Sequence, residues 1–486
     1  MNPLILTDGY KVDHRRQYPP QTTLVYSNWT PRRSRIDGID EVVFFGLQYF
    51  LKKYILGQFQ TEFFDKPKSE VLSKYARRIN NYLGPNQVGV NHIADLHDLG
   101  YIPMVFKAVP EGASVPIRMP MMTMYNTHPD FFWLTNYFET LLSTTIWLPC
   151  NSATIARQYH ILLNDYAAKT SDIAEFVNWQ AHDFSMRGLG GLEAALISGA
   201  GHLLSFNGTD TIPAIDFLED YYNANSDTEL IGGSVAATEH SVMCMGTNVG
   251  EEETFKRLIT EIYPSGIVSI VSDTWDLWKV LTVFLPNLKE KILARDGKVV
   301  IRPDSGNPAD ILCGNPNGKS EAEQKGVVQL LWDVFGGQIN TKGFKQLDTH
   351  IGAIYGDSIT LDRAKEICQR LMQNGFASTN VVLGIGSFTY QYNTRDTFGF
   401  AMKATYGEVD GIGREIYKDP ITDDGTKKSA KGLIKLELQN GRYKMFDRVS
   451  WQEEQKGELK EVFRDGKLLV DQKLSDIRSR VQNSLK

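Results

Sequence analysis

Residues 298–308 read KVVIRPDSGNP, and this stretch decides the fold class. The run Val299–Ile301 is apolar and β-branched, which predicts a buried strand, and the following Pro-Asp-Ser-Gly predicts the turn that ends it. Open α/β sheets and barrels bind their ligands at the carboxyl ends of the strands. We therefore expect the cation of Arg302 and the carboxylate of Asp304 to face a ligand.

The same pattern, an apolar run before a polar or glycine-rich turn, occurs at three other places. The runs are Ile267–Val271 before Asp273, Ile351–Ile354 before Gly356-Asp357, and Asn380–Leu383 before Gly384-Ile385-Gly386. Turn residues 273, 304, 357 and 386 are 31, 53 and 29 residues apart, and a βα unit takes roughly 30 residues. Helical segments between these runs predict a parallel sheet, open or closed into a barrel, and the longer gap leaves room for an extra element.

The remainder of the chain has a different texture. Residues 41–120 mix helical segments with short strands, and residues 398–470 carry turns that are typical of an antiparallel sheet. A final amphipathic helix follows. We expect residues 1–30 and 150–395 to form an α/β barrel, and residues 31–149 and 396–486 to form a second, mostly β domain of α+β character.

Composition excludes several classes of protein. The 486 residues carry a net charge of −6, which argues against nucleic acid as the main partner. The four cysteines lie far apart without metal-binding spacing, which favours free thiols and a reducing compartment. The start does not resemble a signal peptide, and the most apolar long window, residues 131–148, is too polar to span a bilayer. A soluble cytoplasmic protein is expected.

The turns at the strand ends carry groups that suit a phosphorylated sugar. Carboxylates there can bind ribose hydroxyls or Mg²⁺, which prefers oxygen ligands and phosphate co-ligands. Glycine-rich turns between strand and helix offer backbone N–H groups to a phosphate. For any single Asp or Gly, an ordinary turn residue is the alternative interpretation. The candidates in this group are Asp273, Arg302, Asp304, Gly356, Asp357, Gly384, Gly386 and Arg395.

Three motifs upstream add candidates of another kind: HDFSMRG (182–188), GTDT (208–211) and ATEHS (237–241). Phe184 can stack on a planar ring. Asp210 can accept hydrogen bonds from a carboxamide and would repel a carboxylate. His240 follows Glu239 in a polar turn and is either a structural histidine or a nucleophile or phosphate acceptor.

The N-terminal segment is polar and aromatic. Asp8 and Tyr10 either belong to an edge segment docked on the core or line a site, which can belong to another subunit. The basic cluster at residues 31–35, which contains Arg32, is either a solvated loop or an anion clamp.

Taken together, these stretches resemble the nicotinamide phosphoribosyltransferases, a family of type II phosphoribosyltransferases. The matching motifs run in family order from residue 7 to about residue 420: TDGYKVDHRRQYPP, HDFSMRG, GTDT, ATEHS, SIVSDTWD, IRPDSGNP, YGDSI, the run from Gly384 to Arg395 that ends in TRD, and IYKDP. The resemblance implies a pentosyltransferase that forms nicotinamide mononucleotide and pyrophosphate from nicotinamide and phosphoribosyl pyrophosphate in NAD salvage. It further implies Mg²⁺, optional coupling to ATP hydrolysis, an irregular α/β barrel with a second mostly β domain, and a homodimer with active sites at the subunit interface.

The resemblance also implies roles for individual residues. Phe184 and Tyr10 of the partner subunit would sandwich the pyridine ring, and Asp8 of the partner subunit would lie beside that tyrosine. Asp210 would bind the carboxamide, and Arg302 would face the ring. Asp304 and Asp357 would bind the ribose hydroxyls, and Asp273 would lie on the pyrophosphate and sugar side. Gly356, Gly386 and Ser387 would form the phosphate cradle. The implied phosphate-binding cations are Arg187, Arg395, Lys403 and Arg32 of the partner subunit. His240, with Glu239 beside it, matches the histidine that is phosphorylated from ATP, and no metal ligands are assigned.

Two departures and two alternatives accompany this interpretation. Ser387 and Phe388 stand where the family usually has a run of glycines, and Met186 stands where an aromatic residue is common. The nearest alternative is a nicotinate phosphoribosyltransferase, which the carboxylate of Asp210 disfavours. An alternative from another class is a catalytically inactive binding or signalling protein on the same fold.

Overall fold

The computed structural model describes residues 1–356, 358–418 and 430–485. Contacts divide the chain into two compact units. Unit 1 comprises Met1–Thr154, Phe217–Ala224 and Asn393–Lys486, and unit 2 comprises Ile155–Asp216 and Asn225–Tyr392. This division groups residues 1–30 with unit 1, whereas the sequence grouped them with the barrel. As independently folding domains, the ranges expected from the sequence stay a prediction.

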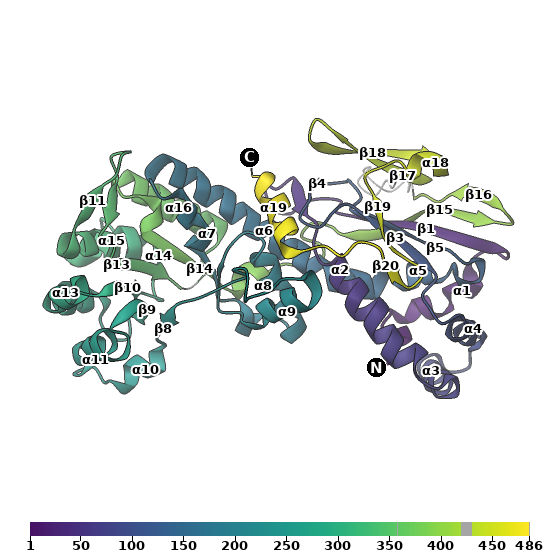
Figure 1. The fold of residues 1–486 in the computed structure, drawn as a ribbon, viewed down its shortest axis with the longest axis horizontal. Helices are drawn as coiled ribbons and strands as arrows, with labels where there is room; N and C mark the ends of the chain where they lie inside the picture. The colour runs from purple at the N-terminus through teal and green to yellow at the C-terminus, as the bar shows by residue number, and fades with distance from the viewer. Residues whose placement is uncertain (357, 419–429, 486) are drawn as a thin grey trace. The chain divides into compact units, whose positions relative to one another are not determined.

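Unit 2 is built on a seven-stranded parallel sheet with the strand order β7-β6-β14-β13-β10-β9-β8 (Figure 1). A parallel bridge between Gly208 and Gly233 links the segments at the two edges, so the sheet curls into an irregular barrel. The strands are β6 (Ala181–Asp183), β7 (Gly208–Thr209), β8 (Ala236–Ala237), β9 (Ser265–Val271), β10 (Asp296–Arg302), β13 (Ile351–Tyr355) and β14 (Val381–Ile385). The expected α/β barrel is confirmed.

Helices connect these strands, and the side chains at their ends explain where they begin. Thr360 accepts a hydrogen bond from the N–H of Arg363 at the start of α16 (Leu361–Gln373), an amphipathic helix that buries Ile367 and Leu371. A small hairpin, β11 (Gly337–Ile339) and β12 (Lys345–Leu347), occupies the longer gap foreseen before β13. The other helices are α7 (Val177–Gln180), α8 (Leu192–His202), α9 (Pro213–Tyr222), α10 (His240–Met245), α11 (Glu251–Arg257), α12 (Leu277–Lys279), α13 (Leu285–Leu293), α14 (Pro308–Cys313), α15 (Glu321–Phe335) and α17 (Ser387–Gln391).

Unit 1 contains a seven-stranded antiparallel sheet with the order β16-β15-β1-β5-β3-β19-β20. Strand β1, from the start of the chain, pairs with β5 and β15, and β19, from the end of the chain, pairs with β3. Both ends of the sequence therefore contribute to this sheet. Its strands are β1 (Thr22–Thr30), β3 (Met104–Ala108), β5 (Met122–Asn126), β15 (Ala401–Val409), β16 (Ile412–Glu415), β19 (Lys460–Arg464) and β20 (Lys467–Leu468).

The two faces of this sheet are covered differently (Figure 1). On one face, Trp29 stacks on Phe400 at 4.4 Å in a core with the helices α2 (Leu47–Phe50), α3 (Lys68–Leu83), α4 (Asn91–Leu99) and α5 (Leu134–Tyr137). On the other face, Tyr26 and Tyr125 pack with α18 (Trp451–Glu454) and the hairpin of β17 (Leu433–Gln439) and β18 (Arg442–Val449). Further elements of unit 1 are α1 (His14–Gln17), β2 (Glu41–Val43), β4 (Ser114–Pro116), α19 (Leu474–Asn483) and the first half of α6 (Glu139–Thr170), which continues into unit 2 from Ile155.

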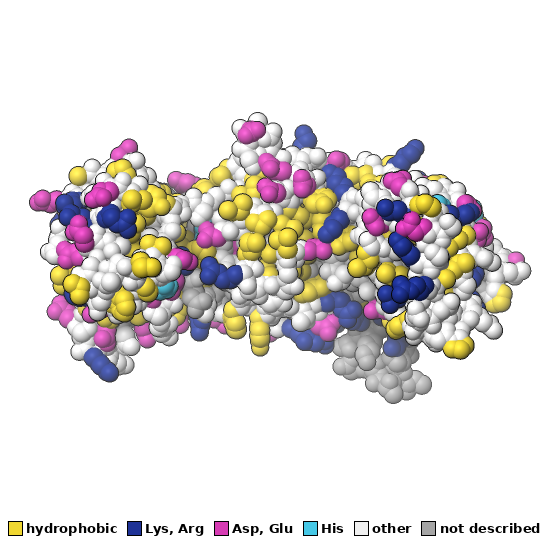
Figure 2. Space-filling view, turned by 90° about the horizontal axis from the view of Figure 1, so that it is seen from below, with side chains coloured by type: hydrophobic (Ala, Val, Ile, Leu, Met, Phe, Trp, Pro, Cys, Tyr) yellow, Lys and Arg dark blue, Asp and Glu magenta, His cyan; other side chains and the backbone are white. Residues whose placement is uncertain are grey.

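The surface and the cysteines agree with the composition. In the face shown in Figure 2, Lys and Arg side chains are interspersed with Asp and Glu side chains and with apolar ones. The four cysteines are free, as expected; Cys150, Cys313 and Cys368 are buried, and Cys244 is exposed. Within the described ranges, the helices are all too short or too polar to cross a membrane.

Candidate active site

The carboxyl ends of neighbouring strands in unit 2 bring several expected side chains together. Phe184 directly follows β6 and Asp210 directly follows β7. The N–H of Phe184 donates to the carbonyl of Ile385 at 2.9 Å, and the N–H of Asp210 donates to the carbonyl of Asp183 at 2.9 Å. These bonds extend the parallel ladder by one residue, so the ring and the carboxylate leave adjacent strands at the same level.

Arg302 links the aromatic side of this site to its acidic side. The guanidinium lies 4.9 Å from the centre of the Phe184 ring and forms an ion pair with Asp304 at 3.1 Å. The side chains of Arg302 and Asp304 are 17% and 19% exposed, so solvent reaches the pair only in part. A cation over an aromatic face is attracted by the ring quadrupole, which helps to fix both groups.

Two glycines make this close packing possible. A Cβ on Gly356 would lie 2.3 Å from the Oδ1 atom of Asp304. A Cβ on Gly384 would lie 2.8 Å from the Cδ2 atom of Phe184 and equally close to the backbone of Gly356. Any larger residue at position 384 would displace the ring, so both glycines are needed for the site to form.

Asp210 is held by two neighbours that the sequence analysis left without a role. The Nε2 atom of His182 and the Oγ atom of Ser234 both lie 2.8 Å from its Oδ1 atom. Burial opposes ionisation of Asp210, but the hydrogen bond and charge of His182, the bond from Ser234 and the charge of Arg302 outweigh it and lower the pKa of this carboxyl. Asp210 is thus a carboxylate at neutral pH.

A second acidic group lies between β9 and β10. The Oδ2 atom of Asp273 accepts hydrogen bonds from the N–H of Asp304 at 3.0 Å and from the hydroxyl of Ser305 at 2.6 Å. Its Oδ1 atom lies 3.3 Å from Nε2 of His240, outside hydrogen-bond geometry, and has no hydrogen-bond partner among the described residues. The structure therefore brings His240, Asp273 and Asp304 together, while Glu239 accepts a bond from the hydroxyl of Ser241.

The expected phosphate turn lies at the start of α17. A Cβ on Gly386 would meet no heavy atom of the described residues within 4 Å, so as far as these residues go the backbone there is open to a ligand. A Cβ on Gly188 would lie 2.1 Å from the hydroxyl of Ser387, which shows how closely the turn beside Arg187 packs on α17. Arg187, Phe184 and Asp210 line one cavity of about 510 Å³. Asp357 lies outside the described residues.

The expected cations of unit 1 form a cluster of like charge. Burial and the positive charges of Arg32, Lys418 and Arg395 lower the pKa of Lys403, against an opposing effect of Glu139. The guanidinium of Arg32 donates to the carbonyl of Gly399 at 3.1 Å, which fixes its position. Lys418 was not among the residues predicted, although it lies within the quoted motif IYKDP. Lys403 thus lies near three further cations, an arrangement that suits a polyanionic ligand.

Asp8 and Tyr10 lie in unit 1, in an ordered N-terminal segment. The carboxylate of Asp8 accepts a hydrogen bond from the hydroxyl of Thr140 at 2.7 Å. The neighbouring Lys11 is 4% exposed and forms an ion pair with Glu139 at 2.6 Å. The ring of Tyr10 is 64% exposed. A firmly anchored segment thus presents an aromatic ring to its surroundings.

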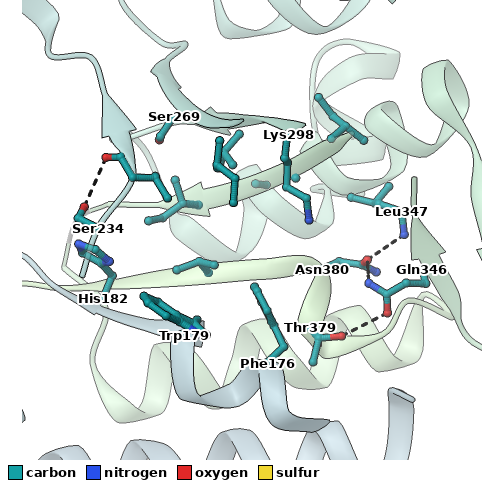
Figure 3. A pocket seen from close by; sticks show the side chains of 18 residues that line it. Phe176, Trp179, His182, Ser234, Ser269, Lys298, Gln346, Leu347, Thr379 and Asn380 are labelled. Carbon is teal, nitrogen blue, oxygen red and sulfur yellow. Dashed lines mark hydrogen bonds between the residues drawn. The ribbon is translucent and has the colours of Figure 1, made fainter. Parts of the chain in front are cut away.

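A cavity of about 430 Å³ lies inside the barrel and is lined by residues of β6, β9, β10, β13 and β14 and of the segments beside them (Figure 3). Figure 3 shows His182 and Ser234 on one side of the space and Gln346, Thr379 and Asn380 on the other. Lys298 extends into it from β10, and burial lowers the pKa of this amine against an opposing effect of Asp348. His182 and Ser234 belong to the wall of this cavity, and they also hold Asp210 of the outer one.

The carboxylates fit a magnesium ion that is shared with a phosphorylated substrate. Among the described residues, no group of three or more His, Cys, Asp or Glu side chains could hold a metal ion. Mg²⁺ in phosphate-transferring sites needs only one or two carboxylates, because the substrate phosphates supply further ligands. Asp273 and Asp304 supply two adjoining carboxylates, and the Oδ1 atom of Asp273 is buried with no hydrogen-bond donor among the residues that the structure describes.

Comparison with known proteins identifies the family. The model of the nicotinate phosphoribosyltransferase (NAPRTase) family matches residues 179–467, and the model of the nicotinamide phosphoribosyltransferase N-terminal domain matches residues 2–104. A nicotinamide phosphoribosyltransferase of Acinetobacter baylyi is 52% identical over 497 residues, which cover 100% of this chain and 98% of the relative. A protein of the same name from Mycoplasma pneumoniae is 37% identical, covering 88% of this chain and 94% of its own.

Two solved structures share the fold at low sequence identity. The nicotinate-nucleotide pyrophosphorylase of Pyrococcus furiosus superposes with a TM-score of 0.57 at 14% identity, covering 98% of this chain and 94% of that one. The human nicotinic acid phosphoribosyltransferase superposes with a TM-score of 0.52 at 14% identity, covering 98% and 93%. These likenesses support the fold, and the sequence matches decide the family. The chain belongs to the nicotinate phosphoribosyltransferase (NAPRTase) family.

Proposed function

We propose that this protein is a nicotinamide phosphoribosyltransferase that works in NAD salvage. It transfers the phosphoribosyl group of phosphoribosyl pyrophosphate to nicotinamide and releases pyrophosphate. The observation that carries this proposal is the ionised Asp210 beside Phe184, since a carboxylate accepts hydrogen bonds from a carboxamide and repels the carboxylate of nicotinate. The names of the relatives from Acinetobacter baylyi and Mycoplasma pneumoniae support it.

The chemistry is a displacement at the anomeric carbon of ribose. The bond from this carbon to pyrophosphate breaks, and a bond to the pyridine nitrogen forms through an oxocarbenium-like transition state. The pyridine nitrogen carries no proton, so no general base is needed, and catalysis consists of positioning and electrostatics. Phe184 positions the ring, Asp210 and Arg302 orient the carboxamide, and Asp304 holds the ribose hydroxyls.

The departing pyrophosphate needs positive charge around it. Asp273 and Asp304 would hold Mg²⁺ together with the substrate phosphates, and the bound ion would neutralise charge on the leaving group. The backbone at Gly356, Gly386 and Ser387 would cradle the 5′-phosphate. The cations that bind phosphate would be Arg187, Arg395, Lys403 and, from the partner subunit, Arg32. Asp357, outside the described residues, would assist Asp304 at the ribose.

The proposal includes a homodimer in which each active site uses residues of both subunits. Tyr10 is 64% exposed. Leu192, which lines the Phe184 cavity, is 64% exposed, and Ile212, next to Thr211 of that cavity, is 70% exposed. Exposed apolar side chains beside a site fit a surface that a second copy covers. In this arrangement, the ring of Tyr10 of the partner subunit packs on the pyridine opposite Phe184.

A mixing experiment tests the shared site. Tyr10→Ala and Asp304→Ala inactivate the site from different sides, so each variant alone is expected to be inactive. After the two are unfolded and refolded together, random pairing gives half heterodimers with one intact site each, and about a quarter of wild-type activity returns. No recovered activity in a mixture shown to contain heterodimers would contradict a shared site.

ATP coupling is proposed to run through His240, whose side chain is 50% exposed and lies 3.3 Å from Asp273. Transfer of the γ-phosphate of ATP to its imidazole would place new negative charge beside the pyrophosphate site. His240→Ala is expected to keep basal synthesis and to lose the stimulation by ATP. Loss of basal synthesis in a folded His240→Ala protein would contradict a purely regulatory role.

The overall activity is tested by mass spectrometry of the product. The purified protein, Mg²⁺, phosphoribosyl pyrophosphate and nicotinamide should yield nicotinamide mononucleotide, and Asp304→Ala should abolish it. Formation of nicotinate mononucleotide from nicotinate, with no reaction of nicotinamide, would favour the nicotinate phosphoribosyltransferase alternative.

The free cysteines fit a reducing compartment, and we place this reaction in the cytoplasm without a nucleic-acid or membrane partner.

A further inference from the structure

We infer that His182 and Ser234 are positioning residues that make the site select an uncharged carboxamide. Both donate a hydrogen bond to the same oxygen of Asp210, and while they do so they cannot donate to a carboxylate of the ligand. The inference rests on the proposed function and deepens it. It assigns roles to two residues on the inner side of the ring-binding site that do not have to touch the substrate.

The three residues come from three adjoining segments of the barrel. His182 lies on β6 directly opposite Gly208 of β7, and Gly208 forms the bridge to Gly233 next to Ser234. A Cβ on Gly208 would lie 2.7 Å from Nδ1 of His182. The glycine therefore lets the imidazole lie across β7 and reach Asp210 two residues further along.

The two carboxylate oxygens of Asp210 accept different numbers of hydrogen bonds. His182 and Ser234 both bond to Oδ1, and within the described part of the chain Oδ2 accepts no hydrogen bond. The side chain of Asp210 is 44% exposed, and it lines the same cavity as Phe184. One oxygen is thus anchored, and the other is available to accept an N–H of a carboxamide.

The same contacts also explain rejection of a carboxylate. The imidazole N–H and the serine hydroxyl are the kind of donors that would bind nicotinate if they were unoccupied. With Asp210 in place, both donors already point at a carboxylate of the protein. His182 is 8% exposed and its ring packs against Phe184 at 4.5 Å, which limits its freedom to turn toward another partner.

This arrangement predicts that His182 has opposite effects in two backgrounds. With Asp210 present, His182 anchors the acceptor of the amide and so favours nicotinamide. Without Asp210, the freed donors of His182 and Ser234 face the ligand and favour nicotinate. A residue that only supports the fold would change the use of both substrates in the same direction in both backgrounds.

The test compares kcat/KM for nicotinamide with kcat/KM for nicotinate in matched variants. His182→Phe keeps a ring against Phe184 and removes the donor, and its selectivity ratio should fall about tenfold, as expected for a lost bond to a charged group. Ser234→Ala should lower the ratio about threefold. His182→Gln keeps a donor near Nε2 and should stay within about threefold of wild type, which tests rescue by a conservative change.

Ser269→Ala is the control for Ser234→Ala. Ser269 lines the same inner cavity, and its hydroxyl has no hydrogen-bond partner among the described residues. The ratio in this variant should stay within about twofold of wild type, because no contact to Asp210 is lost. Thermal unfolding of each variant shows which ones are folded. Because Ser234 is exposed, Ser234→Ala is expected to fold, and its selectivity ratio tests the inference if His182→Phe does not fold.

The decisive comparison uses the Asp210→Ala background. Asp210→Ala should raise kcat/KM for nicotinate about tenfold or more, and adding His182→Phe or Ser234→Ala should take most of that gain away. The inference is overturned if His182→Phe and Ser234→Ala leave the ratio within twofold of wild type, or if they lower kcat/KM for both substrates equally in both backgrounds. A wild-type protein that does not use nicotinamide at all would instead refute the proposed function, whatever the variants do.

Discussion

Two neighbouring carboxylates of the barrel, Asp183 and Asp210, have opposite surroundings. Asp183 is 0% exposed and accepts four hydrogen bonds, from the N–H and hydroxyl of Ser185 and from the hydroxyls of Thr209 and Thr211. Asp210 is 44% exposed and, from the residues that the structure describes, accepts two hydrogen bonds, both at one oxygen. Four donors leave Asp183 no capacity for a ligand, while Asp210 keeps a free oxygen.

This difference indicates a structural role for Asp183 and fits the ligand-binding role that we propose for Asp210. The bonds of Asp183 tie the loop after β6 to the segment after β7, and these segments carry Phe184 and Asp210. A buried carboxylate with all its lone pairs occupied is a structural anchor, because burying a charge without partners is costly. Asp183 therefore positions Phe184 and Asp210, the residues that we propose to contact the ring and the carboxamide.

The largest expected effect comes from removing the structural carboxylate. Asp183→Ala leaves three hydroxyls and one N–H without their acceptor in a buried place, and it should lower the free energy of unfolding by about 4 kcal/mol. Urea unfolding followed by circular dichroism measures this. A loss below about 1 kcal/mol would show that Asp183 is not an anchor.

Asp210→Ala is the matched variant on the functional side. Its side chain is partly exposed, so the free energy of unfolding should change by less than about 1 kcal/mol. The preference for nicotinamide should nevertheless fall by a factor of about 100, since the acceptor of the amide and the repulsion of the acid are both lost. Equal loss of stability in the two variants would break the distinction between these carboxylates.

Gly384→Ala should disturb the ring-binding side through packing alone. The added methyl group would lie 2.8 Å from Phe184 and from the backbone of Gly356. We expect a destabilisation of about 2 kcal/mol and a KM for nicotinamide raised about tenfold. Gly386→Ala is the control, because within the described part of the chain its methyl group meets no atom within 4 Å. It should leave the free energy of unfolding and the KM for nicotinamide unchanged and raise the KM for phosphoribosyl pyrophosphate. A KM for nicotinamide that rises in Gly386→Ala but not in Gly384→Ala would contradict the assignment of the two glycines.

Glu251 extends the comparison to a buried carboxylate with one oxygen that lacks a donor among the described residues. It is 1% exposed, its Oε1 atom has no hydrogen-bond partner among the described residues, and burial, opposed by Lys279, raises its pKa from 4.5 to about 6. The folded state therefore binds this proton more tightly than the unfolded state. Its contribution to stability is fully present below pH 4.5 and is lost as the pH rises through about 6.

Glu251→Gln should remove this dependence on pH. The neutral amide has no cost of ionisation, so the variant should be more stable than wild type at pH 7.5, by about 2 kcal/mol, and about equally stable at pH 4.5. Thermal unfolding at several pH values measures the difference. A difference that stays constant from pH 4.5 to pH 7.5 would show that Glu251 does not titrate in this range.

Much of the barrel was predictable because its longer strands are apolar and β-branched. The runs Ile267–Val271, Val299–Ile301 and Ile351–Ile354 lie within β9, β10 and β13, and the hairpin β11–β12 fills the longer gap between turns. The strands β6, β7 and β8 have only two or three residues. Segments of this length carry no periodic signal, and only their pairing in three dimensions defines them as strands.

Residues of the candidate site were predictable from the sequence where their chemical type alone indicates a function. They were less predictable where their role depends on a contact in three dimensions. Phe184, Asp210, Arg302 and Asp304 stood out as functional types next to strand ends. His182 and Ser234 lie in short strands or next to them, so their position against Asp210 depends on a register that the sequence does not display. The glycine at position 384 likewise has its reason in a contact with Phe184, far away in the chain.

A competition between nicotinamide and nicotinate tests the central claim most directly. The purified protein receives equal concentrations of both compounds with phosphoribosyl pyrophosphate and Mg²⁺, and mass spectrometry quantifies the two mononucleotides. The free oxygen of the ionised Asp210 predicts that nicotinamide mononucleotide dominates in wild type, and that the preference collapses in Asp210→Ala. Nicotinate mononucleotide as the main product of the wild-type protein would contradict the account.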